Sequence, residues 1–321
     1  MSTATPRKVA QPAPAEVATT RPRRGLRASS TFNFWLFTGP FLIGLVIFVF
    51  VPIVWSMYLS FFEARFTVTP SEFVGFANYK QILTDTDFRN SLVTFTVFAA
   101  FIVPATWALS LGLALLVNRL RFMRAFFRSV FFLPTACSYV AASLIWKMSI
   151  FNGVRFGLAN TVLGWFGVEN IAWLANPDPP WYWLVIVTVR LWLQSGFYMI
   201  LFLAALQNIP QELYEAAAID GAKPGWQTFR YITLPQLRAT STAVILLLLI
   251  AAYQAFDEFY NLLSKTTWGQ PPLVELYKMA LGENQNYGAG SAGAVVLTLL
   301  ICVVTLLQGK FMGFGRGEES K

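Results

Sequence analysis

Six long stretches without a charged side chain run through this sequence of 321 residues. Each has about 18 residues or more, which at 1.5 Å per helical residue is enough to cross about 30 Å of hydrocarbon. Only helices and closed barrels satisfy their own backbone groups in lipid, and no series of ten-residue alternating strands is present. The bounding charged residues are Arg27 and Glu63, Arg89 and Arg119, Arg128 and Lys147, Arg190 and Glu212, Arg238 and Asp257, and Glu283 and Lys310. The sequence therefore predicts an all-α polytopic membrane protein with six transmembrane helices.

The composition excludes an ordinary soluble domain. Hydrophobic residues make up 56% of the chain, charged residues 12%, and the mean hydropathy is +0.54. The expected spans cover residues 34–59, 91–117, 129–150, 181–206, 239–263 and 289–310. Residues 1–31 are expected to be a disordered cytoplasmic tail and not a cleavable signal peptide, because the following apolar run is too long. The six-helix domain is predicted to cover residues 32–315, and residues 316–321 to form a second cytoplasmic tail.

The distribution of lysine and arginine predicts the orientation of the spans. With the N-terminus in the cytoplasm, the inner segments carry 16 of these residues and the outer segments carry seven. This excess predicts that both termini are cytoplasmic. It also places the loop 208–238 in the cytoplasm. The net charge of +8 is then a topology signal, and a nucleic-acid partner is not indicated, because the basic residues flank the spans.

Residue types needed for most metal and catalytic sites are scarce. The chain has no histidine and only two cysteines, Cys137 and Cys302, which both fall in expected spans and are predicted to pack there as small apolar residues. No paired acid and base and no Ser-His-Asp arrangement is evident. No GxxxxGK[ST] phosphate-binding loop is present. The sequence thus predicts a chain with no catalytic residues, metal site or bound cofactor. If its function is driven by ATP, the ATP and Mg²⁺ would be held by another polypeptide.

The segment 212–235, between the fourth and fifth spans, predicts two short helices joined by a bend. Asn208 is the candidate cap of the first helix, and Pro210 lies where a helix favours its first residue. Gly221, followed by Pro224, is the expected stop, because glycine tolerates left-handed backbone geometry and proline cannot continue a helix. The second short helix is expected to follow Pro224.

This segment resembles a known family. Glu215-Ala216-Ala217, then Gly221, then Ile232-Thr233-Leu234-Pro235 resemble the cytoplasmic "EAA" loop of ABC importer permeases. The stretches 73–83, 131–152 and 204–217 resemble the carbohydrate (maltose-type) branch, and the resemblance extends over nearly everything from about Phe34 to Phe311. One departure is visible, because ten residues separate Gly221 from Ile232 where the family loop has nine.

The resemblance implies a role for the loop. In this family it is a coupling helix that docks in a cleft of a separate ATPase subunit. Glu215 would meet basic or polar groups of the ATPase, Ala216 and Ala217 would allow close approach, and Gly221 would make the bend. The residues implied in ATPase coupling are Glu215, Ala216, Ala217, Asp220 and Gly221.

The resemblance also implies the partners. It identifies the chain as a multi-pass permease subunit of the bacterial inner membrane, surrounded by lipid. The implied partners are a second homologous permease, two copies of the ATPase and an extracytoplasmic solute-binding lipoprotein that delivers a sugar or oligosaccharide. Alternatives are a permease for another solute, such as glycerol phosphate, a secondary transporter that works alone, and a polytopic membrane enzyme. A lone transporter would need inverted repeats and intramembrane carboxylates for ion coupling, and neither is evident.

Arg190 is a charged residue at membrane depth, nine residues into the fourth expected span. A lone arginine there costs about 2.5–3.5 kcal/mol by insertion scales, so it is expected to face the interior of the bundle. Asp257 and Glu258 lie at a similar depth near the outer end of the fifth span. An intramembrane ion pair between Arg190 and one of these carboxylates is therefore predicted. Two roles stay open, a structural link between the spans and a part of a polar pathway.

Polar and aromatic side chains accompany Arg190 in the fourth and fifth spans. The fifth span resembles the stretch that lines the substrate site in the maltose-type branch. The resemblance implies hydrogen bonds to sugar hydroxyls and aromatic rings that stack on the apolar face of the sugar. The predicted substrate-pathway residues are Gln194, Tyr198, Gln254, Asp257 and Tyr260.

Overall fold

The computed structural model describes residues 26–312, except residues 121, 155, 224, 264–265 and 284. Helices make up nearly all the regular structure of these residues, and their one sheet has two strands. Within the described ranges, five helices are long and apolar enough to cross a membrane, and the number is six if one bent pair of helices forms a single span. The predicted all-α class is therefore confirmed. The chain divides into two compact units between Trp55 and Ser56.

The first unit is an apolar helix with one local irregularity. Its elements are α1 (Leu26–Leu45), the π-helical turn η1 (Val46–Phe50) and the start of α2 (Val51–Leu59). The apolar stretch Thr31–Leu59 has 29 residues and contains the first expected span. Pro52 has no N–H to donate to the carbonyl four residues earlier, and the π-helical turn lies just before it.

The expected tails lie largely outside the described residues. Residues 1–25 and 313–321 are not described. Residues 26–31 are helical, so the prediction of a disordered segment is wrong for them. Once the apolar run has nucleated a helix, each residue added upstream gains a hydrogen bond, and the helix extends past the span.

The second unit contains the remaining elements. Its long helices are α4 (Thr86–Arg119), α8 (Tyr182–Gln207), α12 (Arg238–Tyr253) and α15 (Tyr287–Met312). The shorter elements are β1 (Phe62–Glu63), β2 (Glu72–Phe73), α3 (Ala77–Thr84), α5 (Arg124–Phe132), η2 (Leu133–Ala136), α6 (Tyr139–Ile145), η3 (Trp146–Ile150), α7 (Leu158–Gly164), α9 (Gln211–Ile219), α10 (Trp226–Thr228), η4 (Phe229–Thr233), α11 (Leu234–Gln236), α13 (Asp257–Leu263) and α14 (Pro272–Leu281).

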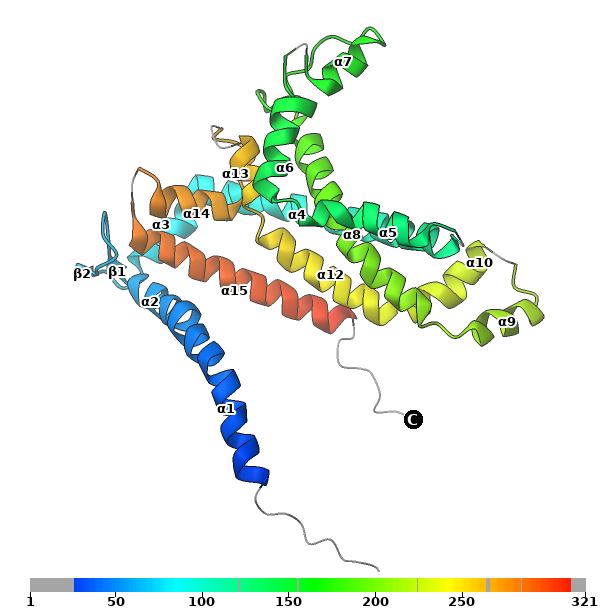
Figure 1. The fold of residues 1–321 in the computed structure, drawn as a ribbon. Helices are drawn as coiled ribbons and strands as arrows, with labels where there is room; N and C mark the ends of the chain where they lie inside the picture. Colours follow the sequence, from blue (N-terminus) through cyan, green and yellow to red (C-terminus); the bar gives the residue numbers. More distant parts are fainter. Residues whose placement is uncertain are drawn as a thin grey trace, which may run out of the picture. The chain divides into compact units, whose positions relative to one another are not determined.

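The third expected span is broken. Arg124–Ala136 and Tyr139–Ile150 meet at an angle of 95°, so the expectation of one helix over residues 129–150 is wrong. Pro134 ends the α-helical pattern in a 3₁₀ turn, and the Ser138 side chain accepts a hydrogen bond from Val140 N at 3.2 Å to start the next helix. The break at residues 137–138 turns α6 away from α5 (Figure 1).

The core of the second unit lies between α4, α8 and α12. Helix α4 packs along α8 and α12, and its Ser110 hydroxyl donates to the Ser195 carbonyl of α8 at 3.0 Å. Helix α5 crosses α8 at Gly196, where a Cβ atom would overlap the Phe131 carbonyl oxygen. Large fully buried side chains here include Phe95, Phe98, Ile186, Met199, Phe202 and Phe259. Small residues therefore permit close helix contact where the long helices cross.

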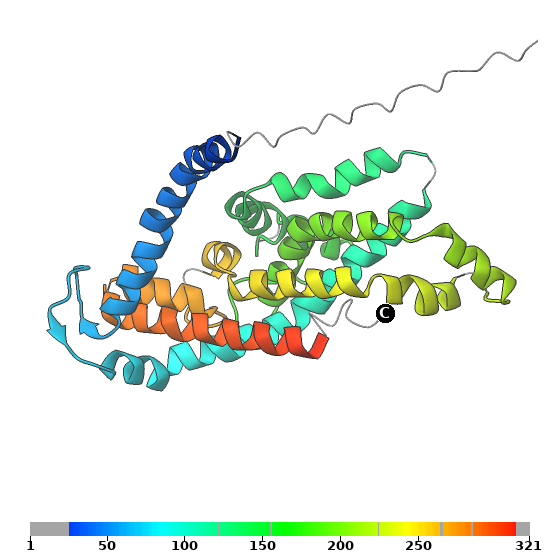
Figure 2. The ribbon, with the colours of Figure 1, turned by 90° about the horizontal axis from the view of Figure 1, so that it is seen from below.

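The two ends of the second unit carry different structures. Figures 1 and 2 show α9 and α10 at one end, and the β1–β2 hairpin, α3 and α14 at the opposite end. The hairpin pairs Phe62 with Phe73 and Glu63 with Glu72. The buried Asn78 amide fixes it to α3, because it donates to the carbonyls of Ser60 and Phe62 at 2.9 Å each. The long helices α4, α12 and α15 run between the two ends.

Both cysteines are free and exposed. The prediction that they pack as small apolar residues of the spans stays a prediction, because an exposed side chain of a span can contact lipid. Cys137 lies in the break of the third span, where the chain is extended, and Cys302 lies on an exposed face of α15.

Candidate functional site

A small polar cavity lies where α6 and α8 meet the fifth span. Its volume is about 180 Å³. It is lined by Tyr139, Arg190, Gln194, Ala251, Gln254, Ala255, Phe256, Asp257 and Glu258. The structure thus brings together three of the five residues that the sequence predicts for a pathway, and both partners considered for Arg190.

The fifth span is broken beside this cavity. Helix α12 ends at Tyr253 and α13 begins at Asp257, so residues 254–256 are not helical where a continuous helix is expected. Ala255 N donates to the Ala252 carbonyl at 3.1 Å, which is a three-residue step instead of the four-residue step of an α-helix. Irregular backbone at membrane depth occurs where it is buried in protein or lines a cavity.

Arg190 pairs with Glu258 and not with Asp257. The Arg190 guanidinium donates to Glu258 Oε1 and to the carbonyl oxygen of Ala251. Both side chains of the pair are buried, with 3% and 2% exposure. The guanidinium carbon also lies 5.6 Å from the centre of the Phe98 ring. The positive charge is therefore neutralised inside the bundle.

The other polar residues of the cavity remain accessible. Gln254 and Asp257 are exposed, and among the described residues no cation lies within ion-pair distance of Asp257. Gln194 is half-buried, and its amide donates to the Tyr139 hydroxyl at 2.8 Å. These side chains offer hydrogen-bond donors and acceptors of the kind that sugar hydroxyls use.

Tyr198 and Tyr260 lie differently from the expectation. Tyr198 of α8 is only 5% exposed and does not line the cavity, because its ring is packed in the hydrophobic core of the second unit. Tyr260 stacks on Phe256, with ring centres 5.3 Å apart and planes 12° apart, and both rings meet Tyr277 of α14. The predicted aromatic surface therefore exists next to the cavity, but Tyr198 is not part of it.

Tyr139 and Tyr277 are residues that sequence reasoning missed. Tyr139 opens α6 directly after the break of the third span, and Tyr277 comes from a loop helix. Neither has a sequence signal of its own. Pro134 is the only nearby hint, because a proline in a span predicts a break and a break exposes the residues that follow it.

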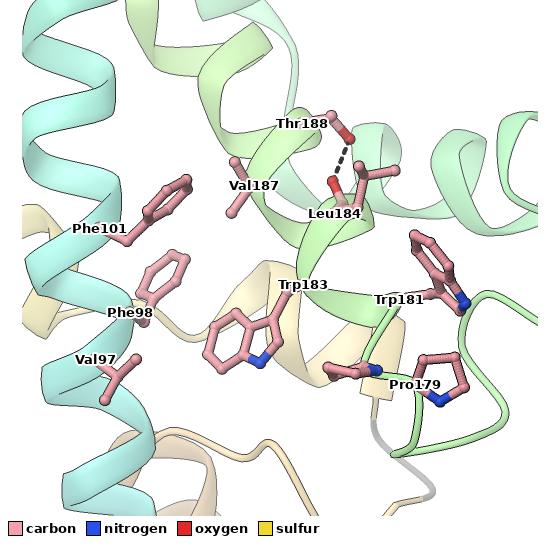
Figure 3. A pocket seen from close by; sticks show the side chains of 10 residues that line it. Val97, Phe98, Phe101, Pro179, Trp181, Trp183, Leu184, Val187 and Thr188 are labelled. Atoms are coloured by element: carbon pink, nitrogen blue, oxygen red, sulfur yellow. Dashed lines mark hydrogen bonds between the residues drawn. The ribbon is translucent and has the colours of Figure 1, made fainter.

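A larger groove between α4 and the start of α8 has a different character (Figure 3). Its volume is about 560 Å³, and its lining includes Val97, Phe98, Phe101, Trp181, Trp183, Leu184 and Val187. The Thr188 hydroxyl donates to the Leu184 carbonyl at 2.8 Å, which is the dashed line in Figure 3, and accepts from Trp146 Nε1 at 3.1 Å. A wall of this kind matches hydrocarbon better than a sugar, so the polar cavity is the stronger candidate site.

The predicted two-helix segment is present at one end of the second unit. Helix α9 ends in a Schellman motif, with Ala222 N bonded to the Ala217 carbonyl at 2.9 Å and Gly221 N bonded to the Ala218 carbonyl at 3.2 Å. Gly221 has φ of +82°, in the left-handed region that glycine favours. The predicted stop of the first helix at Gly221 is therefore confirmed.

The cap of α9 differs from the prediction. The helix begins at Gln211 and its N-cap position is Pro210, with no side-chain cap. Asn208 instead follows the last residue of α8, and its N–H bonds to the Ala205 carbonyl at 3.2 Å. The prediction for Asn208 is wrong because α8 extends to Gln207, so Asn208 terminates one helix instead of starting the next.

The second arm of the segment contains a π-helical turn. It runs through α10, η4 and α11, and η4 lies just before Leu234-Pro235. A π turn holds one more residue than an α turn, and η4 begins in the stretch 222–231, where this loop has one residue more than the family pattern. The Tyr214 and Thr233 hydroxyls lie 3.2 Å apart and join this arm to α9.

The surface of α9 is largely uncovered. Glu215, Ala216, Asp220 and Gly221 are exposed and Ala217 is half-buried. Ile219, an apolar residue, is 87% exposed. The helix lies at the end of the second unit in both views (Figures 1 and 2), so its small-residue surface is free to contact another molecule.

Comparison with known proteins decides the family. Residues 108–311, more than half of the chain, match the family described as the binding-protein-dependent transport system inner membrane component. The chain belongs to this family. The matched region includes α8, the α9–α11 segment and the broken fifth span, so all residues that line the polar cavity lie within it.

Curated relatives of this permease are similar over almost their whole length. The arabinooligosaccharides transport system permease protein AraP of Halalkalibacterium halodurans is 32% identical over 95% of this chain and 97% of the relative. The lactose transport system permease protein LacF of Rhizobium radiobacter is 31% identical over 90% and 97%. The probable starch degradation products transport system permease protein AmyD of Thermoanaerobacterium thermosulfurigenes is 30% identical over 86% and 92%.

A solved structure supports the fold. A chain of a bacterial ABC transporter involved in the import of the acidic polysaccharide alginate matches with a TM-score of 0.77 and 21% identity, over 89% of this permease and 97% of that chain. The resemblance to ABC importer permeases and the predicted permease architecture are therefore confirmed.

Proposed function

We propose that this permease moves a sugar or oligosaccharide across the bacterial inner membrane as one subunit of an ATP-driven importer. The observation that carries the proposal is the polar cavity at the break of the fifth span, in a chain whose relatives of similar length include permeases named for arabinooligosaccharides, lactose and starch degradation products. Discontinuous membrane helices form substrate sites in other transporters, because their backbone and side chains can bind a polar solute at membrane depth.

The substrate pathway runs past the exposed side chains of the cavity. Gln254, Asp257 and the Gln194–Tyr139 pair bind sugar hydroxyls, and the stacked rings of Phe256 and Tyr260 present an apolar face. This combination suits a sugar, which has polar edges and an apolar ring face. A homologous second permease completes the cavity from the opposite side.

The α9–α11 segment couples this movement to ATP. Glu215, Ala216, Ala217, Asp220 and Gly221 dock in a cleft of a separate ATPase, of which the importer has two copies. The exposure of these residues and the hydrogen-bonded bend at Gly221 support this role. The permease itself binds no cofactor, and ATP and Mg²⁺ are held by the ATPase. Closure of the ATPase dimer pulls α9 and turns the cavity outward, where a solute-binding lipoprotein delivers the sugar.

The orientation follows the charge distribution. Both termini and α9 lie in the cytoplasm, and the β1–β2 hairpin, α3 and α14 lie on the outer side. The excess of lysine and arginine on the α9 side supports this arrangement, as does the position of these elements at opposite ends of the second unit (Figure 1).

The test is purification of the tagged full chain from its membrane, followed by reconstitution. We expect an ATPase, a second permease and a lipoprotein to co-purify, and proteoliposomes to accumulate a neutral radiolabelled oligosaccharide only with ATP inside. Glycerol phosphate is the matched competitor. Uptake of glycerol phosphate in preference to every oligosaccharide would overturn the sugar proposal. Uptake without any ATPase would overturn the importer proposal and favour a lone transporter.

A further inference from the structure

Arg190 occupies a backbone acceptor that an unbroken fifth span would use itself. In a continuous α-helix the N–H of Ala255 donates to the carbonyl of Ala251. Here the Arg190 guanidinium donates to that carbonyl, and Ala255 N donates to Ala252 instead. The break at residues 254–256 therefore coincides with the contact that replaces the helical hydrogen bond.

Helix α13, which follows the break, is held at both ends by cations from other spans. Near its start, Glu258 pairs with Arg190 of α8. At its end, the Lys147 amine of η3 donates to the carbonyls of Asn261 at 2.8 Å and Leu262 at 3.3 Å. A cation at the carboxyl end of a helix satisfies its last carbonyls and matches its dipole. The short helix is thus fixed independently of α12.

A purely structural role does not account for this arrangement. A continuous α12–α13 helix would satisfy the same backbone groups without taking two charges out of water. Buried ion pairs are often no more stabilising than apolar side chains of the same volume. The broken arrangement does provide one thing that a continuous helix would not, because it turns Gln254 and Asp257 out of the helical register and exposes both at the cavity.

We propose that Arg190 is a positioning residue of the substrate pathway, which keeps the fifth span broken so that Gln254 and Asp257 face the cavity. Glu258 orients its guanidinium, and Lys147 holds the far end of α13 in place. The role of this cavity as a substrate pathway rests on the proposed function, but the effect of Arg190 on the break does not depend on which solute is carried.

The experiment measures the exposure of position 254 in the assembled importer. Gln254→Cys is introduced into a chain with Cys137→Ser and Cys302→Ser, and its reaction rate with a water-soluble charged thiol reagent is followed. The Arg190→Met, Glu258→Met pair removes both charges with little change in volume. Without Arg190, Ala255 N is expected to bond the Ala251 carbonyl, and the reaction should slow about tenfold or more, as expected for the loss of a charge-assisted hydrogen bond.

Two comparisons separate positioning from folding. Arg190→Lys keeps the charge but lacks the planar fork that reaches both Glu258 and the Ala251 carbonyl, so its reaction rate should lie between those of the unmodified and the double-methionine chains. A single cysteine at the exposed Thr67, near the β1–β2 hairpin, should react at the same rate in every background. Both rates are measured per assembled complex, with the amount of co-purified ATPase as the readout of assembly.

An unchanged rate at position 254 in the double-methionine chain would overturn the proposal and leave a structural ion pair. If that chain fails to assemble, Arg190→Gln with Glu258→Gln provides the same comparison, and failure of both to assemble would likewise show that the pair serves folding. Failure of sugar uptake in the unmodified importer would overturn the proposed function while leaving the result at position 254 valid.

Discussion

At the scale of single residues, the geometry of the fifth span decides which carboxylate pairs with Arg190. The sequence predicts a carboxylate near Arg190 and leaves Asp257 and Glu258 as equal candidates. The structure selects Glu258 because α13 begins at Asp257, so that the next residue points into the bundle and Asp257 points to the cavity. Which carboxylate pairs with Arg190 depends on the position of the break. A sequence pattern that assumes a continuous helix cannot predict that position.

A substitution at Gly196 tests how closely α5 packs against α8. A Cβ atom at this position would overlap the carbonyl oxygen of Phe131, which is backbone and cannot rotate away. We expect Gly196→Ala to force the helices apart and to cost about 1–3 kcal/mol, measured as a lower thermal midpoint of the purified permease. Gly112→Ala on α4 is the control, because no atom lies within 4 Å of the added Cβ. That control should be neutral or stabilising by about 0.4–1 kcal/mol. Equal midpoints for both variants would contradict the close contact.

Substitutions at Ala217 test whether the small-residue surface of α9 lets the ATPase approach closely. Ala217→Arg is expected to abolish ATP-driven uptake, because a long charged side chain prevents close approach of the ATPase, while membrane insertion is retained. Ala217→Ser, which stays small, should keep most of the uptake. Uptake per inserted chain is the measurement. Normal transport by the arginine variant with an undisturbed ATPase complex would refute close docking at this residue.

At the scale of elements, the spans and their breaks differ in how far the sequence predicts them. Long charge-free stretches require helices of a given length, so five of the six spans are found close to their expected bounds, although the fifth span has an internal break. The break of the third span has a local cause in Pro134. The break of the fifth span has neither proline nor glycine, and the contact that replaces its hydrogen bond comes from Arg190, more than 60 positions earlier. A tertiary contact of this kind leaves no local pattern to read.

The segment between α6 and α8 is held together by one buried side chain, that of Asn160, and its role can be tested by substitution. The Asn160 amide donates to the carbonyls of Asn152, Val154 and Ile171 at 3.1–3.4 Å, and its oxygen accepts from Ile171 N and from Trp173 Nε1. Asn160→Leu leaves several of these groups unsatisfied, and each costs about 1–3 kcal/mol. We expect residues 151–180 to be cleaved by added protease at least about tenfold faster. Asn170→Leu, at an exposed position, is the control, and equal cleavage of the two variants would contradict the role of Asn160.

The half-buried carboxyl group of Glu275 in α14 should make the stability of the permease depend on pH. Burial raises the pKa of Glu275, and Lys278, at 3.6 Å, opposes this only in part. The folded chain therefore holds the Glu275 proton more tightly than the unfolded chain, so stability is lost as the pH rises from the unfolded pKa through the raised folded pKa. Glu275→Gln should raise the thermal midpoint relative to the unmodified chain at about pH 8 and much less at about pH 4. The same difference at both pH values would contradict the burial argument.

At the scale of the whole molecule, the two candidate sites of the permease lie at different positions along its long helices. The polar cavity lies at the breaks of the third and fifth spans, and α9 lies at one end of the unit (Figures 1 and 2). Helix α8 contributes Arg190 and Gln194 to the cavity and leads through residues 208–210 into α9. A pull on α9 would therefore act on the helix that positions the break, because helices are stiff along their axes.

The most direct test of this account is cross-linking of α9 to the ATPase. In a chain with Cys137→Ser and Cys302→Ser, Ala216→Cys is compared with Thr67→Cys in the complete importer, with a short thiol-to-amine cross-linker. The account predicts that the Ala216→Cys chain links to the ATPase subunit with a yield that changes when ATP is added, and that the Thr67→Cys chain does not link to it. If the cysteine placed in α9 never links to the ATPase, or reacts with a membrane-impermeant reagent from outside intact cells, the account is contradicted.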